Sequence, residues 1–331
     1  MEILLIIGGV LIYFFTALDI VQTTLSMQGG GWITSRYSHK FWDLFRKATG
    51  NDGRKKILSH AGYLLLISIL LIWVLLLWLS FVLLLSSSEG SILNSTTRIS
   101  AGLIEKIYYA GFTISTLGVG DYIASSNTWR ILSAVYSFTG LILLTMSVTY
   151  FIPLLSAVIE QRKLGIRLSN LGNSPEEILI NSWNGKDFAQ FTDMIEDLSE
   201  SLVQHSQNHR AYPVIHYFHN WKEKNAVILQ LARLHEALYL LKYEISEEIR
   251  PDLIKLKPLE VAIQNYTEVI LEVTHLNVLE ETPPLARTDT LREQGLLLEN
   301  RKEISVTGEL KKTRRIFQTL VQQDGWTWEL V

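Results

Sequence analysis

Two long runs without a charged residue dominate the chain, and a short apolar segment that ends in glycines separates them. The runs cover residues 61–85 and 131–158. As helices rising about 1.5 Å per residue, both are long enough to cross a hydrocarbon core about 30 Å thick. The segment between them, residues 101–113, is too short to span and is typical of a re-entrant element. Non-helical backbone is tolerated at membrane depth only where protein buries it or water lines it, so this arrangement predicts a pore.

A third apolar run begins beside the N-terminus. Only Met1 and Glu2 precede residues 3–18, which favours a membrane anchor over a secretory signal with its basic start. Asp19 follows the run, and we interpret it as a solvated helix end paired with a nearby basic residue. Residues 32–47 repeat apolar side chains at helical spacing among basic ones. This pattern favours a helix on the inner membrane surface, with packing on the soluble part as the alternative.

Charge predicts the orientation of the spans. Lys and Arg are frequent between the first and second runs, whereas Arg98 is the only basic residue of 86–100. The positive-inside rule therefore predicts a multi-pass plasma-membrane protein with its N-terminus outside and its C-terminal half in the cytoplasm. A net charge of −3 gives no indication of a nucleic-acid partner, and the lack of Cys excludes disulfides, thiol catalysis and Cys-ligated zinc.

The sequence Thr-Ile-Ser-Thr-Leu-Gly-Val-Gly-Asp-Tyr occupies residues 113–122, directly after the short apolar segment. It resembles the pore loop of the potassium channel superfamily, usually written T-x-T-T-V-G-Y-G-D. The resemblance covers roughly residues 57–161 and implies that rings of backbone carbonyls replace the hydration shell of K⁺. One loop cannot close such a ring, and the resemblance implies a homotetramer.

The resemblance also implies which residues form the selectivity filter. The implied ion-coordinating residues are Thr116, Leu117, Gly118, Val119 and Gly120, with K⁺ bound by the backbone carbonyls of the first four. Successive carbonyls must point to one side, which regular structure does not allow. Gly118 and Gly120 suit this because glycine accepts a positive φ at little steric cost.

Neighbouring residues are expected to support this filter. Asp121 is expected to hydrogen-bond towards the pore helix with Tyr108 or Tyr109 as its partner, and Ser115 is a further supporting residue. The loop departs from the family pattern at two positions. Val119 replaces the usual aromatic residue, and Leu117 replaces the common Val. Neither change removes a carbonyl, but the missing ring motivates the alternative of a weakly selective monovalent cation channel.

The last apolar run contains candidates for gating. Gly140 lies mid-span and Pro153 lies near the expected cytoplasmic end. Glycine permits a bend or a close helix approach, and proline removes a backbone hydrogen bond. Thr145 and Thr149 share one helical face and are candidates for lining an inner cavity. The alternatives are ordinary membrane-helix Gly and Pro, and Thr hydroxyls that bond their own backbone.

From about residue 165 the pattern is that of soluble helices. A helix is predicted to begin at Pro175 with Ser174 as its cap, and apolar periodicity predicts others over 188–203 and 226–241. Residues 314–322 are expected to form a last short helix. Pro251 and Pro258 are expected to interrupt helical structure in the part of the chain that follows residue 241. A group of histidines invites a metal interpretation, but Pro213 breaks their helix and no acidic ligand has fitting spacing, so ordinary packing is preferred. These histidines are His205, His209, His216 and His219.

Together these observations predict an all-α membrane protein with three transmembrane helices, a re-entrant pore helix and filter loop, and a cytoplasmic helical domain. The expected parts are an N-terminal transmembrane helix (1–27), a basic linker (28–56), a pore domain (57–161) and a cytoplasmic domain (162–331). Within the pore domain the expected elements are an outer helix (57–86), a pore helix (101–113), the filter (114–121) and an inner helix (128–160).

The predicted function is K⁺ conduction across a lipid bilayer by a homotetramer without a cofactor. The cytoplasmic domain is expected to bias the gate through an unidentified ligand or protein. The alternatives are the weakly selective channel and a non-conducting, membrane-anchored sensor or scaffold. No nucleophile–base set, phosphate loop or convincing metal cluster in the sequence indicates an enzyme.

Overall fold

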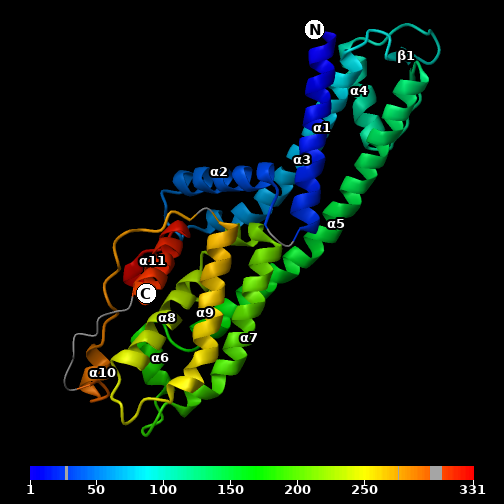
Figure 1. Ribbon diagram of the computed structural model, residues 1–331. Helices are drawn as coiled ribbons and strands as arrows, with labels where there is room; N and C mark the ends of the chain where they lie inside the picture. The colour runs from blue at the N-terminus through cyan, green and yellow to red at the C-terminus, as the bar shows by residue number, and fades with distance from the viewer. Residues whose placement is uncertain (27–28, 275, 299–307) are drawn as a thin grey trace. The chain divides into compact units, whose positions relative to one another are not determined.

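The computed structural model describes residues 1–26, 29–274, 276–298 and 308–331. Helices dominate this part of the chain (Figure 1). The elements of the first half are α1 (Glu2–Leu25), α2 (Trp32–Ala48), η1 (Lys56–His60), α3 (Ala61–Ser86), β1 (Ile92–Asn94), α4 (Leu103–Ile114), β2 (Tyr122–Ala124) and α5 (Asn127–Ser169). Those of the second half are α6 (Pro175–Ser182), α7 (Ala189–Ala211), η2 (Pro213–Tyr217), η3 (Glu223–Asn225), α8 (Val227–Tyr243), α9 (Leu253–Val273), α10 (Asp289–Glu293), α11 (Gly308–Gln323) and η4 (Trp328–Leu330).

Three of the described helical segments are long and apolar enough to cross a membrane, namely Glu2–Leu25, Lys56–Ser86 and Asn127–Ser169. The predicted class, an all-α membrane protein with a helical C-terminal region, is thereby confirmed. The last of these helices does not stop at the expected position 160 but continues to Ser169. Its extension, residues 161–169, mixes charged, polar and apolar residues and lies in the second of two compact units.

The chain divides into two compact units. The first comprises residues 1–40 and 64–153, and the second comprises residues 41–63 and 154–331. The boundaries therefore fall inside α2, α3 and α5 rather than at the ends of the expected linker. Residues 41–63, which the sequence analysis divided between a linker and the pore domain, belong to the unit that contains the C-terminal helices.

Polar contacts fix the long helices of the first unit to one another. The Ser80 hydroxyl of α3 donates to the Gly9 carbonyl of α1 at 2.7 Å and lies 2.5 Å from the Tyr136 hydroxyl of α5. Because the single Ser80 proton goes to Gly9, Tyr136 is the donor to Ser80. A Cβ on Gly9 would lie 2.9 Å from the Ser80 carbonyl. Glycine therefore permits the close crossing at which these hydrogen bonds form.

A short antiparallel sheet flanks the expected pore loop, residues 114–121, in the same unit. β1 precedes α4 and β2 follows the loop, with Ile92 opposite Ala124 in the register. The Asp121 carbonyl also accepts a hydrogen bond from Ser95 N–H at 2.8 Å. The two chain segments that flank the loop are thus tied together. The sequence analysis did not predict these strands, because three residues carry too little alternation to be recognised.

The second unit is a helical domain built around α8. All residues of α8 from Val227 to Leu241 are buried, and α7 packs along α9 (Figure 1). The helix predicted over 226–241 is confirmed, but its polar side is buried as well. Glu236 receives two hydrogen bonds of 2.8 Å from Arg314 of α11. Burial alone would raise the pKa of Glu236, but the nearby His235 ring and the Arg314 guanidinium outweigh it and lower that pKa.

Other helix predictions for this unit are confirmed, with one exception. Ser174 caps α6 by accepting a hydrogen bond from Glu177 N–H at 3.1 Å. Pro258 was expected to interrupt the chain, but it lies within α9. The helix starts at the Asp252 cap, and the carbonyl that Pro258 leaves without a donor belongs to Ile254, which is 78% exposed. Water can satisfy that carbonyl, so the helix continues past the proline.

Candidate functional site

The pore loop begins where α4 ends. Ser115 N–H donates to the Gly111 carbonyl at 3.0 Å, and Thr116 N–H donates to the Thr113 carbonyl at 3.1 Å. Leu117 N–H then donates to Phe112 at 2.9 Å. The first amides of the loop thus fold back onto the helix end and satisfy its last carbonyls. The end of α4, rather than the side chains of the loop, therefore sets the direction of the backbone that follows.

The backbone of the loop takes a left-handed conformation at every second residue. The φ angles are 59° at Thr116, 58° at Gly118 and 85° at Gly120. Both glycines were predicted to do this, but Thr116 was not, since a β-branched residue in this region costs about 1–3 kcal/mol. Within the described chain, the carbonyls of the residues implied as ion ligands accept no hydrogen bond. These residues are Thr116, Leu117, Gly118 and Val119.

The side chains of the loop are open in the single chain. Leu117 is 71% exposed and Val119 is 49% exposed. A groove of about 490 Å³ runs between α4, the loop and α5, and Phe112 and Arg130 are among its lining residues.

Of the expected supporting residues, Tyr108 is the one that contacts Asp121. Its phenol group lies near enough to the Asp121 carboxylate for the two to interact electrostatically. The Tyr109 hydroxyl instead lies 2.8 Å from Ser133 Oγ, which links α4 to α5. Ser115 Oγ donates to the Phe112 carbonyl at 3.2 Å and so caps the pore helix. The structure thus separates three residues for which the sequence implied one shared role.

On the inner helix, Gly140 makes the closest approach. A Cβ at this position would lie 1.9 Å from the Ile114 carbonyl, so α5 touches the last residue of the pore helix here. Close approach, rather than bending, is the property of glycine used in this structure. The Thr145 hydroxyl donates to the Leu141 carbonyl at 3.0 Å and Thr149 donates to Thr145 at 3.1 Å, as the alternative for these residues stated. Pro153 lies inside α5 as the last residue of the first unit.

Asp19 is a correction to the sequence analysis. It was interpreted as a solvated helix end, but it is only 2% exposed. Its Oδ1 accepts hydrogen bonds from the N–H groups of Ile33 and Thr34 at 2.8 and 3.1 Å. Its Oδ2 accepts from the Thr34 hydroxyl at 2.6 Å and from Trp73 Nε1 at 2.8 Å. Four donors surround the carboxylate, so it needs no basic partner.

Asp19 acts as a cap for α2 supplied by another helix. Ile33 and Thr34 are the second and third residues of α2, whose N–H groups have no acceptor inside the helix. A carboxylate at this end also faces the positive pole of the helix dipole. A Cβ on Gly31 would lie 2.2 Å from Asp19 Oδ1, so a glycine is required there. The sequence contained two signs of this cap, namely the charge of Asp19 at the end of an apolar run and the glycine-rich connection that precedes α2.

The helix predicted over residues 32–47 exists as α2, and its second half packs on the C-terminal domain. Trp42 is 4% exposed and donates to the Gln323 carbonyl at 3.2 Å. Arg46 donates to Gln322 at 3.3 Å. For residues 41–48 the stated alternative, packing on the soluble part, is therefore correct. Packing on this domain is favoured over a position on the membrane surface because Trp42 offers both a large apolar surface and an N–H donor.

The four histidines do not assemble into one site. The rings of His205 and His209 lie 4.5 Å apart and both contact Tyr266, whereas His216 contacts His209 at 6.3 Å. Burial lowers the pKa of His205 to about 3 and that of His209 well below its usual value, so both rings are neutral. Among the described residues, no group of three or more His, Cys, Asp or Glu is arranged to hold a metal ion. His219 makes its ring contacts with Trp42 and Trp326 instead, although it lines one small cavity together with His216.

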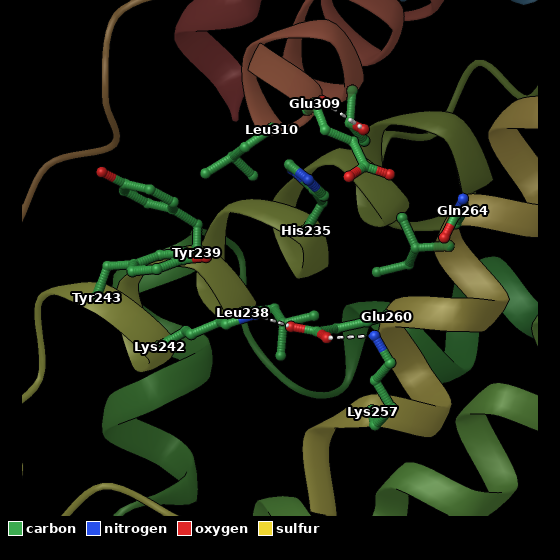
Figure 2. A pocket seen from close by; sticks show the side chains of 12 residues that line it. His235, Leu238, Tyr239, Lys242, Tyr243, Lys257, Glu260, Gln264, Glu309 and Leu310 are labelled. Atoms are coloured by element: carbon green, nitrogen blue, oxygen red, sulfur yellow. Dashed lines mark hydrogen bonds and ion pairs between the residues drawn. The ribbon is translucent and has the colours of Figure 1, made fainter. Parts of the chain in front are cut away.

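A pocket of about 230 Å³ opens between α8, α9 and α11 of the second unit. Figure 2 shows His235 at its centre, with Glu309 on one side and an ion-paired group on the other. In that group Glu260 contacts Lys242 at 2.5 Å and Lys257 at 3.8 Å. Burial opposes the charge of Lys242, but the Glu260 carboxylate outweighs it and raises the pKa of Lys242. The pocket is a candidate place for the unidentified ligand expected in this domain.

Two comparisons with known proteins match different lengths of this chain. Residues 68–157 match a family model described as "Ion channel". The chain is also 31% identical over 325 residues to the uncharacterized membrane protein YdjJ of Bacillus subtilis, and the match covers 98% of this chain and 94% of that protein. No solved structure matches the chain. The matched ion-channel segment contains the pore loop, Gly140 and the larger part of both flanking spans.

Proposed function

Because this chain belongs to the family of the membrane protein YdjJ, and its pore segment to an ion channel family, we propose that it is one subunit of a homotetrameric potassium channel. The observation that carries the proposal is the backbone of the pore loop. Positive φ values at Thr116, Gly118 and Gly120 alternate along a stretch whose carbonyls have no hydrogen-bond donor in the described chain. Such carbonyls are free to replace the water around a cation.

The exposed surface of the loop supports assembly. One chain contributes a single set of carbonyls, and a closed ring requires several copies related by symmetry. The groove between α4, the loop and α5 offers a second copy an apolar surface beside Leu117 and Val119. Four copies are proposed because the loop resembles that of tetrameric potassium channels.

The contacts of Asp121 support a proposal for selectivity. Val119 removes the aromatic ring that usually supports the filter. The electrostatic interaction of Tyr108 with Asp121 is proposed to supply a different link between the pore helix and the end of the loop. We therefore propose that the filter is held firmly enough to prefer K⁺ over Na⁺. The alternative is a weakly selective monovalent cation channel, in which Val119 leaves the carbonyl rings too adaptable.

Gating is proposed to involve both units. α5 is one continuous helix from the pore unit into the C-terminal unit, and Pro153 lacks the N–H that would donate within that helix. α2 likewise begins at the Asp19 cap and continues into the half that packs on Gln322 and Gln323. With the N-terminus outside, as the basic connection predicts, the C-terminal unit is cytoplasmic and biases the gate through these helices.

The proposal predicts that Gly118→Ala abolishes K⁺ flux from liposomes that contain the purified protein. A methyl group at φ 58° strains the backbone by about 1–2 kcal/mol and disturbs the neighbouring carbonyls. The measurement is K⁺ efflux, with the protein's assembly checked by size-exclusion chromatography. Gly185→Ala is the matched control, because Gly185 also has a positive φ of 92° and open space, but lies in the C-terminal unit.

Wild type and Gly185→Ala are expected to release K⁺ at similar rates, and Gly118→Ala to behave as empty liposomes. Equal flux through Gly118→Ala and wild type would contradict the assignment of the filter. An assembled wild-type protein that releases neither K⁺ nor Na⁺ would instead favour the non-conducting sensor or scaffold.

A further inference from the structure

His219 joins three separate parts of the second unit. It follows η2, and its ring is fully buried. Nδ1 lies 2.8 Å from Oδ1 of Asp324, in the segment after α11. Nε2 lies 2.7 Å from the carbonyl of Gly53, in the connection between α2 and α3. The imidazole therefore bridges the α2–α3 connection and the C-terminal segment.

The hydrogen-bonding partners determine the protonation of this ring. A carbonyl oxygen only accepts, so Nε2 must carry a proton to bond Gly53. The Asp324 carboxylate also accepts only, and its Oδ2 already receives Trp326 Nε1 at 2.9 Å. Nδ1 must therefore carry a proton too. Both contacts exist together only when His219 is an imidazolium, and a neutral ring loses one of them.

The electrostatics agree with this requirement. Burial alone would lower the pKa of His219, but the Asp324 carboxylate and the Gly53 carbonyl outweigh it and raise that pKa. Arg162 of α5 and His216 of η2 line the same small cavity as His219 and Asp324. Charged groups farther along the contacting elements are Asp52 and Arg54 beside Gly53, and Asp43 and Arg46 beside Trp42 of α2.

The surrounding backbone is built for close contact. Gly53 N–H donates to the Gly325 carbonyl at 2.8 Å. A Cβ on Gly53 would lie 2.9 Å from that carbonyl, and Gly325 has a φ of 85°, so both positions require glycine. The ring of Trp326 stacks on His219 with centroids 5.8 Å apart. Residues 324–326 are thus tied to the α2–α3 connection by the His219 ring and by the Gly53–Gly325 backbone hydrogen bond.

We propose that His219 is a proton-dependent latch, which holds residues 324–326 on the α2–α3 connection and releases them as the pH rises. The sign follows from the chemistry. The contact is complete below the ordinary pKa of histidine, near 6.5, and is lost as the pH rises through the higher value of the folded state. Only the further step, in which release biases conduction through α2 and α3, rests on the proposed channel function.

Asp324→Asn gives the sharpest test because it reverses the proton requirement. An Asn amide at this position donates to a neutral Nδ1 and still accepts from Trp326 through its oxygen. In this variant the contact between Asn at position 324 and His219 therefore forms at alkaline pH and weakens when the His219 ring is protonated. His219→Gln, which cannot titrate, is the second variant. His60→Gln is the matched control, because His60 lies in the same unit and its ring contacts that of Tyr63 rather than the C-terminal segment.

The measurement is hydrogen exchange of the full-length protein in detergent from about pH 6.5 to about pH 9, with labelling times scaled to the intrinsic rate. Peptides that contain Gly53 and Trp326 report the latch. Their protection in wild type is expected to fall on the order of tenfold per pH unit above the folded-state pKa. His60→Gln should behave as wild type, His219→Gln should show no pH dependence, and Asp324→Asn should show the opposite one.

Constant protection of both peptides in wild type over this range would overturn the proposal, as would a wild-type pH profile in Asp324→Asn. If the variants fail to fold, ¹⁵N chemical shifts of the wild-type His219 ring decide instead. Two protonated nitrogens near neutral pH are expected, and a neutral ring there would overturn the proposal. Neither readout depends on ion flux, so failure of the latch and failure of the channel function are distinguishable.

Discussion

Asp19→Ala is expected to lower the free energy of unfolding of the first unit by at least about 3 kcal/mol. The substitution leaves buried donors on Ile33, Thr34 and Trp73 without their acceptor. Each such group costs about 1–3 kcal/mol. The start of α2 also loses its cap and a favourable charge at the positive pole of its dipole. The effect is large because one carboxylate serves α1, α2 and α3 at once.

Thermal denaturation of the purified protein in detergent measures this effect. Trp73→Phe removes one of the four donors and leaves a small cavity where the larger indole ring packs, so it should cost about 1–2 kcal/mol, less than Asp19→Ala. Glu2→Gln is the matched control, because Glu2 is an exposed carboxylate on the same helix and should leave the melting temperature unchanged. An Asp19→Ala protein that melts with the control would show that the carboxylate is not the cap described here.

Gly140→Ala is expected to damage both assembly and conduction. The added methyl group would lie 1.9 Å from the Ile114 carbonyl, which is backbone and cannot rotate away. The inner helix and the end of the pore helix must therefore separate, at a cost of about 1–3 kcal/mol or more. Because Ile114 directly precedes the loop, the displacement reaches the carbonyls of Thr116 and Leu117.

Gly8→Ala is the matched control for this prediction. A Cβ on Gly8 meets Leu83 Cδ1 at 3.9 Å, which is an ordinary contact, and alanine favours a helix over glycine by up to about 1 kcal/mol. Melting temperature and K⁺ efflux are measured for both variants. Gly8→Ala should melt at or above the wild-type temperature and conduct, whereas Gly140→Ala should melt lower and lose flux. Normal flux through Gly140→Ala would contradict a tight contact at this position.

The features that the sequence predicted well are local or periodic. Uninterrupted apolar runs identified the spans, and the Ser174 cap with Pro175 identified the start of α6. The extent of α5 was underestimated, because its last turns are charged on one side and packed on the other. Periodicity reports one face of a helix, so it did not reveal that α8 is buried on all sides.

The features that the sequence analysis missed depend on partners that are distant along the chain. Asp19 meets Trp73 across 54 positions, and His219 meets Asp324 across 105. No spacing rule connects such pairs, and a charge at the end of a span reads equally well as solvated or buried. The positive φ of Thr116 was missed for a different reason. β-Branched residues rarely adopt this conformation, and here the hydrogen bonds at the end of α4 impose it.

The reversal potential of the reconstituted protein tests the central claim most directly. In a planar bilayer with a tenfold K⁺ gradient and an opposite Na⁺ gradient, a K⁺-selective pore reverses close to the K⁺ equilibrium potential, about 59 mV from zero. We predict this value for wild type and no current for Gly118→Ala. A reversal near zero would identify a weakly selective channel. A protein that assembles but passes no current under any voltage or pH would contradict the proposed conduction of K⁺.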